Sequence, residues 1–130
     1  MNQFLKFVLA ALVFSLVSAC ATRVPVYNIV NAPVDVSNKK ATLDEVGDAI
    51  RRAGAALGWQ MKLVKPGLIA GTLNLRTHTA NVDIAYNNKT YDITYKDSAN
   101  LDYEGGTIHK NYNGWIQNLD RQIRANLSAL

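Results

Sequence analysis

The chain has 130 residues, a formal net charge of +4 and a single cysteine. This length allows one domain with a modest core but not two, and one cysteine excludes a disulfide within the molecule. The 14 lysines and arginines are scattered, never more than two in a row, so we do not expect a nucleic-acid partner, which requires a concentrated basic surface.

The first 20 residues have the pattern of an export signal. Lys6 precedes a short apolar run, residues 7–14, and small residues follow in Val17-Ser18-Ala19-Cys20. The run is too short to cross about 30 Å of hydrocarbon as a permanent helix. A cysteine directly after Ser18-Ala19 departs from the usual small-residue cleavage site. An ordinary secretory signal with an incidental cysteine remains the alternative.

This closing segment resembles the lipobox of bacterial lipoproteins. The resemblance implies that residues 1–19 are removed as a signal peptide and that Cys20 carries a diacylglycerol and an N-terminal acyl group. Several acyl chains on one residue hold a domain at a membrane for long periods, at about 0.8 kcal/mol per buried methylene. Ala21 stands where many Gram-negative bacteria have aspartate in lipoproteins retained at the inner membrane. The resemblance therefore implies the outer membrane, with the domain facing the periplasm.

Residues 20–41 are expected to form the acylated cysteine and an extended tether. Pro25 and Pro33 favour extended backbone, and the segment has no helical period. Its apolar part, around Val26 and Ile29, leaves two possibilities open: disorder, or docking as an edge strand, where prolines are tolerated.

The folded domain is expected to span residues 42–130 and to open with a helix. Thr42 and Glu45 form a capping box, and Gly58 stands where a left-handed residue ends a helix. Gly47 and Gly54 are predicted to permit close approach to a sheet. Spacings of three and four residues define one apolar stripe, made of Leu43, Val46, Ile50, Ala53 and Leu57.

From residue 59 the period changes to two, which predicts four strands joined by short turns in an antiparallel meander. The turns are expected at Lys65-Pro66-Gly67, at Thr77-His78-Thr79, and at Asn87-Asn88, since asparagine accepts positive φ readily. The apolar faces comprise Trp59, Met61 and Leu63; Ile69, Gly71, Leu73 and Leu75; Ala80, Val82, Ile84 and Tyr86; and Tyr91, Ile93 and Tyr95.

A closing helix is predicted from Tyr112 to Leu127, capped by Asn111, with one apolar stripe. Two helices with one stripe each and a sheet with one apolar face predict a two-layer α+β domain, in which both helices pack on one face of the four-stranded meander. In topology this layout is similar to the helix-grip domains of some envelope-assembly lipoproteins, a likeness that implies little about function.

The polar segment Asp97 to Lys110 lacks any period and is expected to be a long loop, the kind of segment that often carries function. Three of its residues match positions 1, 3 and 5 of a calcium loop, but Asn111 stands where a bidentate glutamate is required, so no metal site is predicted. A solvated turn is the alternative to a binding loop. The candidate partner- or ligand-binding residues are Asp97, Asn100, Asp102, Tyr103, Glu104 and His109.

Catalysis is not expected. Ser98, His109 and Asp102 have the residue types of a nucleophilic triad, yet no Gly-x-Ser-x-Gly turn accompanies them. The two histidines, His78 and His109, are too few for a zinc site, and no cofactor is predicted. We expect His109 to make a structural hydrogen bond at the start of the last helix.

Aromatic residues around the loop offer a binding surface. Tyr103 has no period that would bury it, whereas Tyr112 and Trp115 fit the stripe of the last helix. Asn113-Gly114 weakens that helix, which a close packing contact or a binding surface would explain.

Two segments resemble small, uncharacterised proteobacterial lipoproteins: Tyr95-x-x-Ser98-x-Asn100-Leu101-x-Tyr103-x-Gly105-Gly106-Thr107-Ile108-His109 and Tyr112-Asn113-x-Trp115-Ile116-x-Asn118-Leu119, together with the helix from Leu43 to Trp59. The resemblance supports the fold and the cellular address and implies no biochemical role.

The sequence therefore favours an outer-membrane-anchored periplasmic protein whose loop and last helix contact another envelope protein without catalysis. The alternative is a small-ligand binder, with a peptidoglycan fragment or a lipid as ligand. A cavity lined by Tyr86, Tyr91 and Tyr95 would favour the ligand, and a flat apolar patch near Tyr103 would favour the partner. The oligomeric state is left open.

Overall fold

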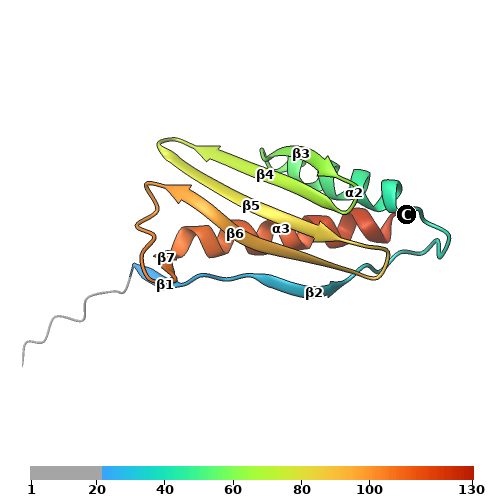
Figure 1. The fold of residues 1–130 in the computed structure, drawn as a ribbon, viewed down its shortest axis with the longest axis horizontal. Coiled ribbons are helices and arrows are strands. Elements are labelled where there is room, and N and C mark those ends of the chain that lie inside the picture. The colour runs from blue at the N-terminus through green and yellow to red at the C-terminus, as the bar shows by residue number, and fades with distance from the viewer. Residues whose placement is uncertain (1–21) are drawn as a thin grey trace, which may run out of the picture.

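The computed structural model describes residues 22–130 (Figure 1). The predicted export signal and the predicted lipidation site, Cys20, lie outside the described residues. The described chain is an α+β domain with two helices packed together, a five-stranded antiparallel sheet and a two-stranded sheet. Its elements are β1 (Arg23–Pro25), β2 (Ile29–Pro33), α2 (Leu43–Ala56), β3 (Gln60–Lys65), β4 (Leu68–Leu75), β5 (His78–Tyr86), β6 (Thr90–Ala99), β7 (Thr107–His109) and α3 (Lys110–Ser128).

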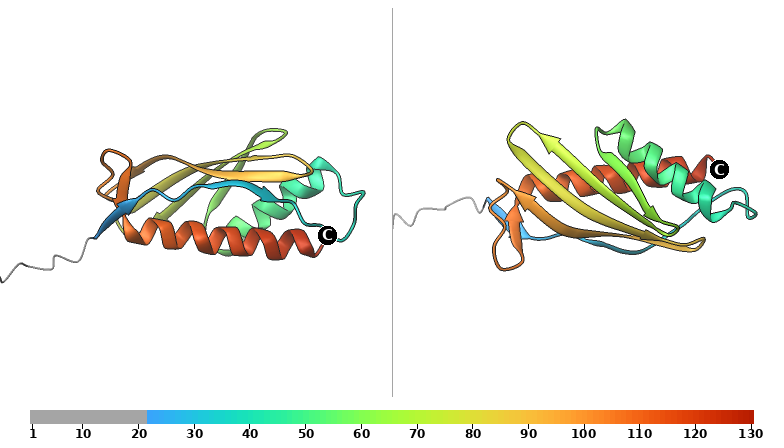
Figure 2. Two further views of the ribbon diagram at one scale, coloured as in Figure 1. Left: turned by 90° about the horizontal axis from the view of Figure 1, so that it is seen from below. Right: turned by 45° about the horizontal axis from the view of Figure 1, so that its top comes forward.

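The large sheet has the strand order β2-β6-β5-β4-β3, and β1 pairs separately with β7. Both helices lie on the same side of the large sheet, and α3 runs along its length (Figures 1 and 2). The hydrophobic core fills the space between these two layers, since the buried side chains come from the inner face of the sheet and from the facing stripes of α2 and α3. No helix within residues 22–130 is both long and apolar enough to cross a membrane.

The expected start of α2 is confirmed. The Thr42 hydroxyl accepts a hydrogen bond from the Glu45 amide at 3.1 Å, and Gly58 after the helix has a φ of 88°. Gly54 permits the predicted close approach, because a Cβ there would lie 2.5 Å from the Met61 sulfur on β3. The expected stripe is wrong at Leu57, which is exposed at the end of the helix.

The antiparallel meander is also confirmed: β4 and β5 pair in continuous register, and β5 and β6 pair with one shift between Asn81 and Val82. One expected turn mechanism was wrong: the Asn87 carboxamide oxygen accepts from the amides of Lys89 (2.7 Å) and Thr90 (2.8 Å), and the turn does not use positive φ there. The β4–β5 connection is shorter than expected because Arg76 adopts a left-handed φ of 56° and His78 already belongs to β5.

The expectation of a four-stranded sheet was wrong, because β2 adds a fifth strand. It pairs antiparallel with β6, with Ile29 opposite Ile93 and Ala32 opposite Tyr91, and both Ile29 and Ala32 are buried. The segment expected to be a tether therefore docks, and the folded part begins at β1 rather than at residue 42. The apolar contacts of β2 come from a strand distant in sequence, which local periodicity does not reveal.

The other edge strand, β3, departs from its predicted burial. Leu63 is exposed rather than buried, as is Val64, and a bulge lies between Leu63 and Lys65. Such irregularity together with lysines protects an edge strand against pairing with other chains.

Helix α3 has the expected apolar stripe, with Trp115 only half-buried. Its cap was misassigned to Asn111. The cap is His109, whose Nδ1 accepts from the Asn111 amide at 3.2 Å, so the structural role expected for this histidine is confirmed.

Candidate functional site

The polar segment before α3 is largely built into the fold rather than being a long free loop. Strand β6 extends to Ala99, and residues 107–109 form β7. Between them Leu101 is 2% exposed and belongs to the core, and its carbonyl accepts from the His109 amide at 2.8 Å. The expectation of a loop from Asp97 to Lys110 was therefore wrong over much of its length.

Two of the predicted binding residues, Asp97 and Asn100, stabilise neighbouring structure. The Asp97 carboxylate accepts a hydrogen bond from the side-chain amide of Asn81 at 2.6 Å, across the β5–β6 pair. Asn100 has a left-handed φ of 56°, donates to the Thr77 carbonyl at 2.7 Å, and its own carbonyl lies 2.6 Å from Nδ1 of His78. These contacts attach the segment to the β4–β5 turn.

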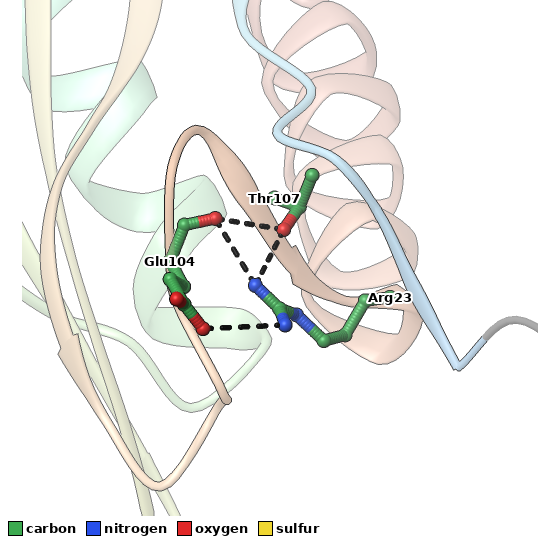
Figure 3. Close-up of polar contacts among 3 residues, drawn as sticks. All are labelled: Arg23, Glu104 and Thr107. Atoms are coloured by element: carbon green, nitrogen blue, oxygen red, sulfur yellow. Dashed lines mark hydrogen bonds and ion pairs between the residues drawn. The ribbon is translucent and has the colours of Figure 1, made fainter.

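Glu104 attaches the same segment to the N-terminal strand (Figure 3). The Arg23 guanidinium donates to the Glu104 carbonyl at 3.1 Å and to the Thr107 hydroxyl at 2.7 Å, and it lies 3.4 Å from the Glu104 carboxylate. The Glu104 side chain is 82% exposed, so the ion pair itself contributes at most about 1 kcal/mol. Strand β1 also pairs with β7, with Arg23 opposite His109. We call β1, β7 and the Arg23–Glu104–Thr107 contacts the N-terminal clamp.

Asp102 and Tyr103 are exposed, as Asp97, Asn100 and Glu104 also are. Asp102 is exposed with a φ of 52°. Tyr103 is 47% exposed, and its ring stacks on Tyr95 at a centroid distance of 4.4 Å. Tyr95 in turn packs edge-on against Tyr112, with a centroid distance of 5.6 Å. One face of the Tyr103 ring is therefore packed against other aromatic rings, and its exposed part is accessible to a binding partner.

The interior tyrosines pack in the core. The Tyr91 hydroxyl donates to the Asp120 carboxylate, which also accepts from Arg124 at 3.1 Å. Burial raises the pKa of Tyr91, as does the hydrogen bond to Asp120, while Asp120 raises the pKa of Arg124. Burial also raises the pKa of Tyr112, whose hydroxyl has no hydrogen-bond partner among residues 22–130.

The cavity that would have favoured a ligand between helices and sheet is not formed by Tyr86, Tyr91 and Tyr95. Tyr86 and Tyr91 are buried as part of the core, and Tyr95 packs between two other tyrosine rings.

The residues considered for catalysis or metal binding have separate partners. Ser98 is hydrogen-bonded to the Tyr95 hydroxyl at 2.8 Å, and His109 caps α3. Within the part of the chain that the structure describes, no three His, Cys, Asp or Glu side chains come together as a possible metal site.

A groove that sequence reasoning did not identify lies beside the first turns of α3 and has a volume of about 570 Å³. Asn113, on its wall, accepts from the Tyr27 amide at 3.0 Å and donates to the Pro25 carbonyl at 2.9 Å, so it ties α3 to the chain after β1. This contact accounts for the weak helix former at that position. The lining residues are Val24, Lys110, Asn111, Asn113, Gly114, Trp115, Gln117 and Asn118.

Gly114 has no packing reason to be glycine, since nothing lies within 4 Å of the position that a Cβ would take. Its lack of a side chain instead leaves space in the groove. Trp115 is half-buried beside it, with its ring 6.4 Å from that of His78. The Asn113-Gly114 pair was the sequence signal for this site, because both residues weaken a helix without obvious gain.

No protein-family model, curated protein or solved structure matches this chain.

Proposed function

We propose that this protein is an outer-membrane lipoprotein, anchored through acylated Cys20 on the periplasmic face, whose domain binds another envelope protein without catalysis. The observation that carries the proposal is the position of the groove. Its lining includes Val24 of β1, and the Lys110 amide at its edge donates to the Thr22 carbonyl at 2.9 Å. The chain that leads to the lipobox cysteine therefore enters the fold at the groove.

The lining chemistry suits a polypeptide partner. Asn111, Gln117 and Asn118 supply amide groups that both donate and accept, which matches the mixed polarity of a backbone segment. Trp115 offers a large, partly exposed apolar surface, and tryptophan is enriched at protein interfaces. Lys110 is the one charged residue of the lining.

A peptidoglycan fragment is the second candidate occupant. An aromatic ring beside several amide side chains is suited to a sugar. Lys110 would meet a peptide carboxylate. A lipid ligand has less support, because the lining is polar and the interior tyrosines fill the core.

The finer architecture belongs to the same proposal. We take the order of helix, antiparallel meander and helix on one side of a sheet as support for a helix-grip-like layout. This likeness is one of topology and carries no function.

The anchor is tested by Cys20→Ala. Without the acylated sulfur, the folded domain is expected to move from the membrane fraction to the soluble periplasmic fraction, because no other long-lived attachment remains. Fractionation after a high-salt wash, together with incorporation of labelled palmitate, measures both consequences.

Ala21→Asp is the matched control, since it keeps the cysteine. It should still incorporate palmitate, and by the sorting rule of the lipobox class it should shift to the inner-membrane fraction. A Cys20→Ala protein that stayed on membranes after the salt wash would refute the anchor.

The groove is tested by in-cell crosslinking from a photoreactive amino acid at position 118. A discrete protein adduct is expected there and not from a matched probe at position 56, the exposed last residue of α2. Identification by mass spectrometry separates the two occupants: a glycan adduct supports the alternative instead. An anchored, folded protein that yields no adduct at position 118 contradicts both.

Gly114 supplies variants for the same experiment. Gly114→Ala is expected to raise the free energy of unfolding by about 1 kcal/mol, since alanine is the better helix former and meets no neighbour. Gly114→Gln should fold as well but place a side chain in the groove and remove the adduct. Loss of the adduct in both variants would point to altered helix structure rather than to filling of the groove.

A further inference from the structure

We infer that one end of the domain lies against the lipid surface of the membrane that holds the anchor. This end, the membrane-facing tip, is defined by the exposed side chains of Leu75, Arg76, Tyr103 and Lys110. The inference rests on the proposed acylation of Cys20 and adds to it an orientation and a second contact with lipid.

The first step concerns the distance between the anchor and the fold. Thr22 is fixed by the hydrogen bond from Lys110, and Arg23 already belongs to β1. Only two residue spacings separate Cys20 from Thr22, and an extended chain covers at most about 3.5 Å per residue, so the two Cα atoms lie within about 7 Å of each other. A connection this short keeps that end of the domain at the bilayer surface.

The second step shows that the tip is a single region. The β4–β5 turn, with Leu75 and Arg76, is held to Asn100 by the contacts of Thr77 and His78. The segment after Asn100 carries Tyr103 and is held to the chain near the anchor by Arg23. Figure 1 shows the β4–β5 turn, the segment before β7 and the start of β1 at one end of the molecule, with the C-terminus and the β2–α2 connection at the other.

The third step is the chemistry of these side chains. Tyr103 is 47% exposed and Leu75 45%, so both present apolar surface at this end of the domain. Tyrosine favours the boundary between hydrocarbon and headgroups, and arginine lays its apolar stem on such a surface while its charge stays in water.

Charge adds a modest attraction. Arg76 and Lys110 would each gain about 1 kcal/mol near an anionic lipid surface. Asp102 carries the opposite charge at the same end, and Glu104 is already paired with Arg23. The contact is therefore expected to rest more on Tyr103 and Leu75 than on net charge.

The test uses the full lipoprotein reconstituted in vesicles of phosphatidylethanolamine and phosphatidylglycerol, with a fluorophore on one introduced cysteine, because the acylated Cys20 offers no free thiol. Thr77→Cys places the probe at the tip without removing a tip side chain, and Lys39→Cys places it in the β2–α2 connection. Lipids with a quenching group near the headgroup are expected to quench the probe at position 77 several-fold more than the probe at position 39.

Three variants sharpen the test. In the Thr77→Cys background, Arg23→Ala should reduce quenching, because loosening β1 lengthens the tether, whereas the matched charge change Arg52→Ala on α2 should not. The double substitution Leu75→Ser with Tyr103→Ser should also reduce it. Co-sedimentation of protein and vesicles after a high-salt wash reports the anchor independently.

The outcomes separate the two ideas. Protein that fails to sediment with vesicles overturns the anchor and this inference together. Protein that sediments but shows equal quenching at positions 77 and 39 leaves the anchor in place and overturns the orientation. Unequal quenching that the Leu75 and Tyr103 substitutions leave unchanged overturns the lipid contact.

Discussion

Leu101→Ala is expected to lower the free energy of unfolding by about 2 to 5 kcal/mol, the range found for leucines truncated inside a packed core. Leu101 is 2% exposed although its neighbours in sequence are polar. Its position is determined by the left-handed residues on either side, Asn100 and Asp102, which turn the chain so that the side chain between them enters the core. A cavity there also weakens the support of β7, since the Leu101 carbonyl accepts from the His109 amide.

Urea unfolding followed by far-UV circular dichroism measures this change. Leu75→Ala removes the same side chain from an exposed site on the neighbouring turn and should cost less than about 1 kcal/mol. If the two variants had equal stability, the segment from residue 100 to 106 would be peripheral to the fold, and the N-terminal clamp would lose its support.

Alkaline pH is expected to destabilise the domain steeply, through Tyr91 and Tyr112. Burial raises the pKa of both phenols in the folded state above their ordinary value of about 10. The folded state therefore binds these protons more tightly than the unfolded chain does. The resulting stability is fully present below pH 10 and is lost as the pH rises from there toward the folded-state pKa, by about 1.4 kcal/mol per pH unit for each tyrosine.

Single substitutions distinguish the two tyrosines. Tyr112→Phe removes a buried hydroxyl with no partner among residues 22–130, so at pH 7 it should be neutral or stabilising. Tyr91→Phe removes a hydrogen bond to Asp120 and should cost about 1 kcal/mol at pH 7.

Urea titrations between pH 8 and pH 11 measure the dependence on pH. Above pH 10, each substitution should remove the contribution of one proton, about 1.4 kcal/mol per pH unit, from the slope of the free energy of unfolding against pH. The double variant should remove the contribution of two protons. If the double variant lost stability above pH 10 as steeply as the original chain, groups other than Tyr91 and Tyr112 would be responsible for the loss.

The elements that depend on local signals could be predicted from the sequence. The Thr42 cap needs only the residue three positions later, and the alternation in β5 and β6 reflects one buried face of each strand. The two helices and the central meander follow from such patterns.

The parts that the sequence did not reveal depend on contacts between distant segments. β1 and β7 have three residues each, too few for a period, and β2 has no alternation that separates docking from disorder. Strand β1 pairs with β7 and β2 pairs with β6, so these contacts join the start of the described chain to its second half. The structural contacts of Asp97, Asn100 and Glu104 could not be predicted for the same reason, because these residues bond to neighbours that only the fold brings close.

The groove beside α3 left a weak trace in the sequence. Asn113 and Gly114 stood out as poor helix formers, but the reason for each differs: Asn113 holds the chain after β1, and Gly114 leaves space. Local propensity marks such positions without distinguishing a structural contact from an open surface.

The attachment of β1 to α3 also has a mechanical consequence. A pull on the chain at Thr22 reaches α3 directly, through the Lys110 amide and the two hydrogen bonds of Asn113, while β1 has no place in the five-stranded sheet. Tension between the proposed anchor and the partner proposed to bind beside α3 would then act on a few residues at one end of the domain. Because β1 lies outside the five-stranded sheet, such tension acts on its pairing with β7 before it reaches the large sheet.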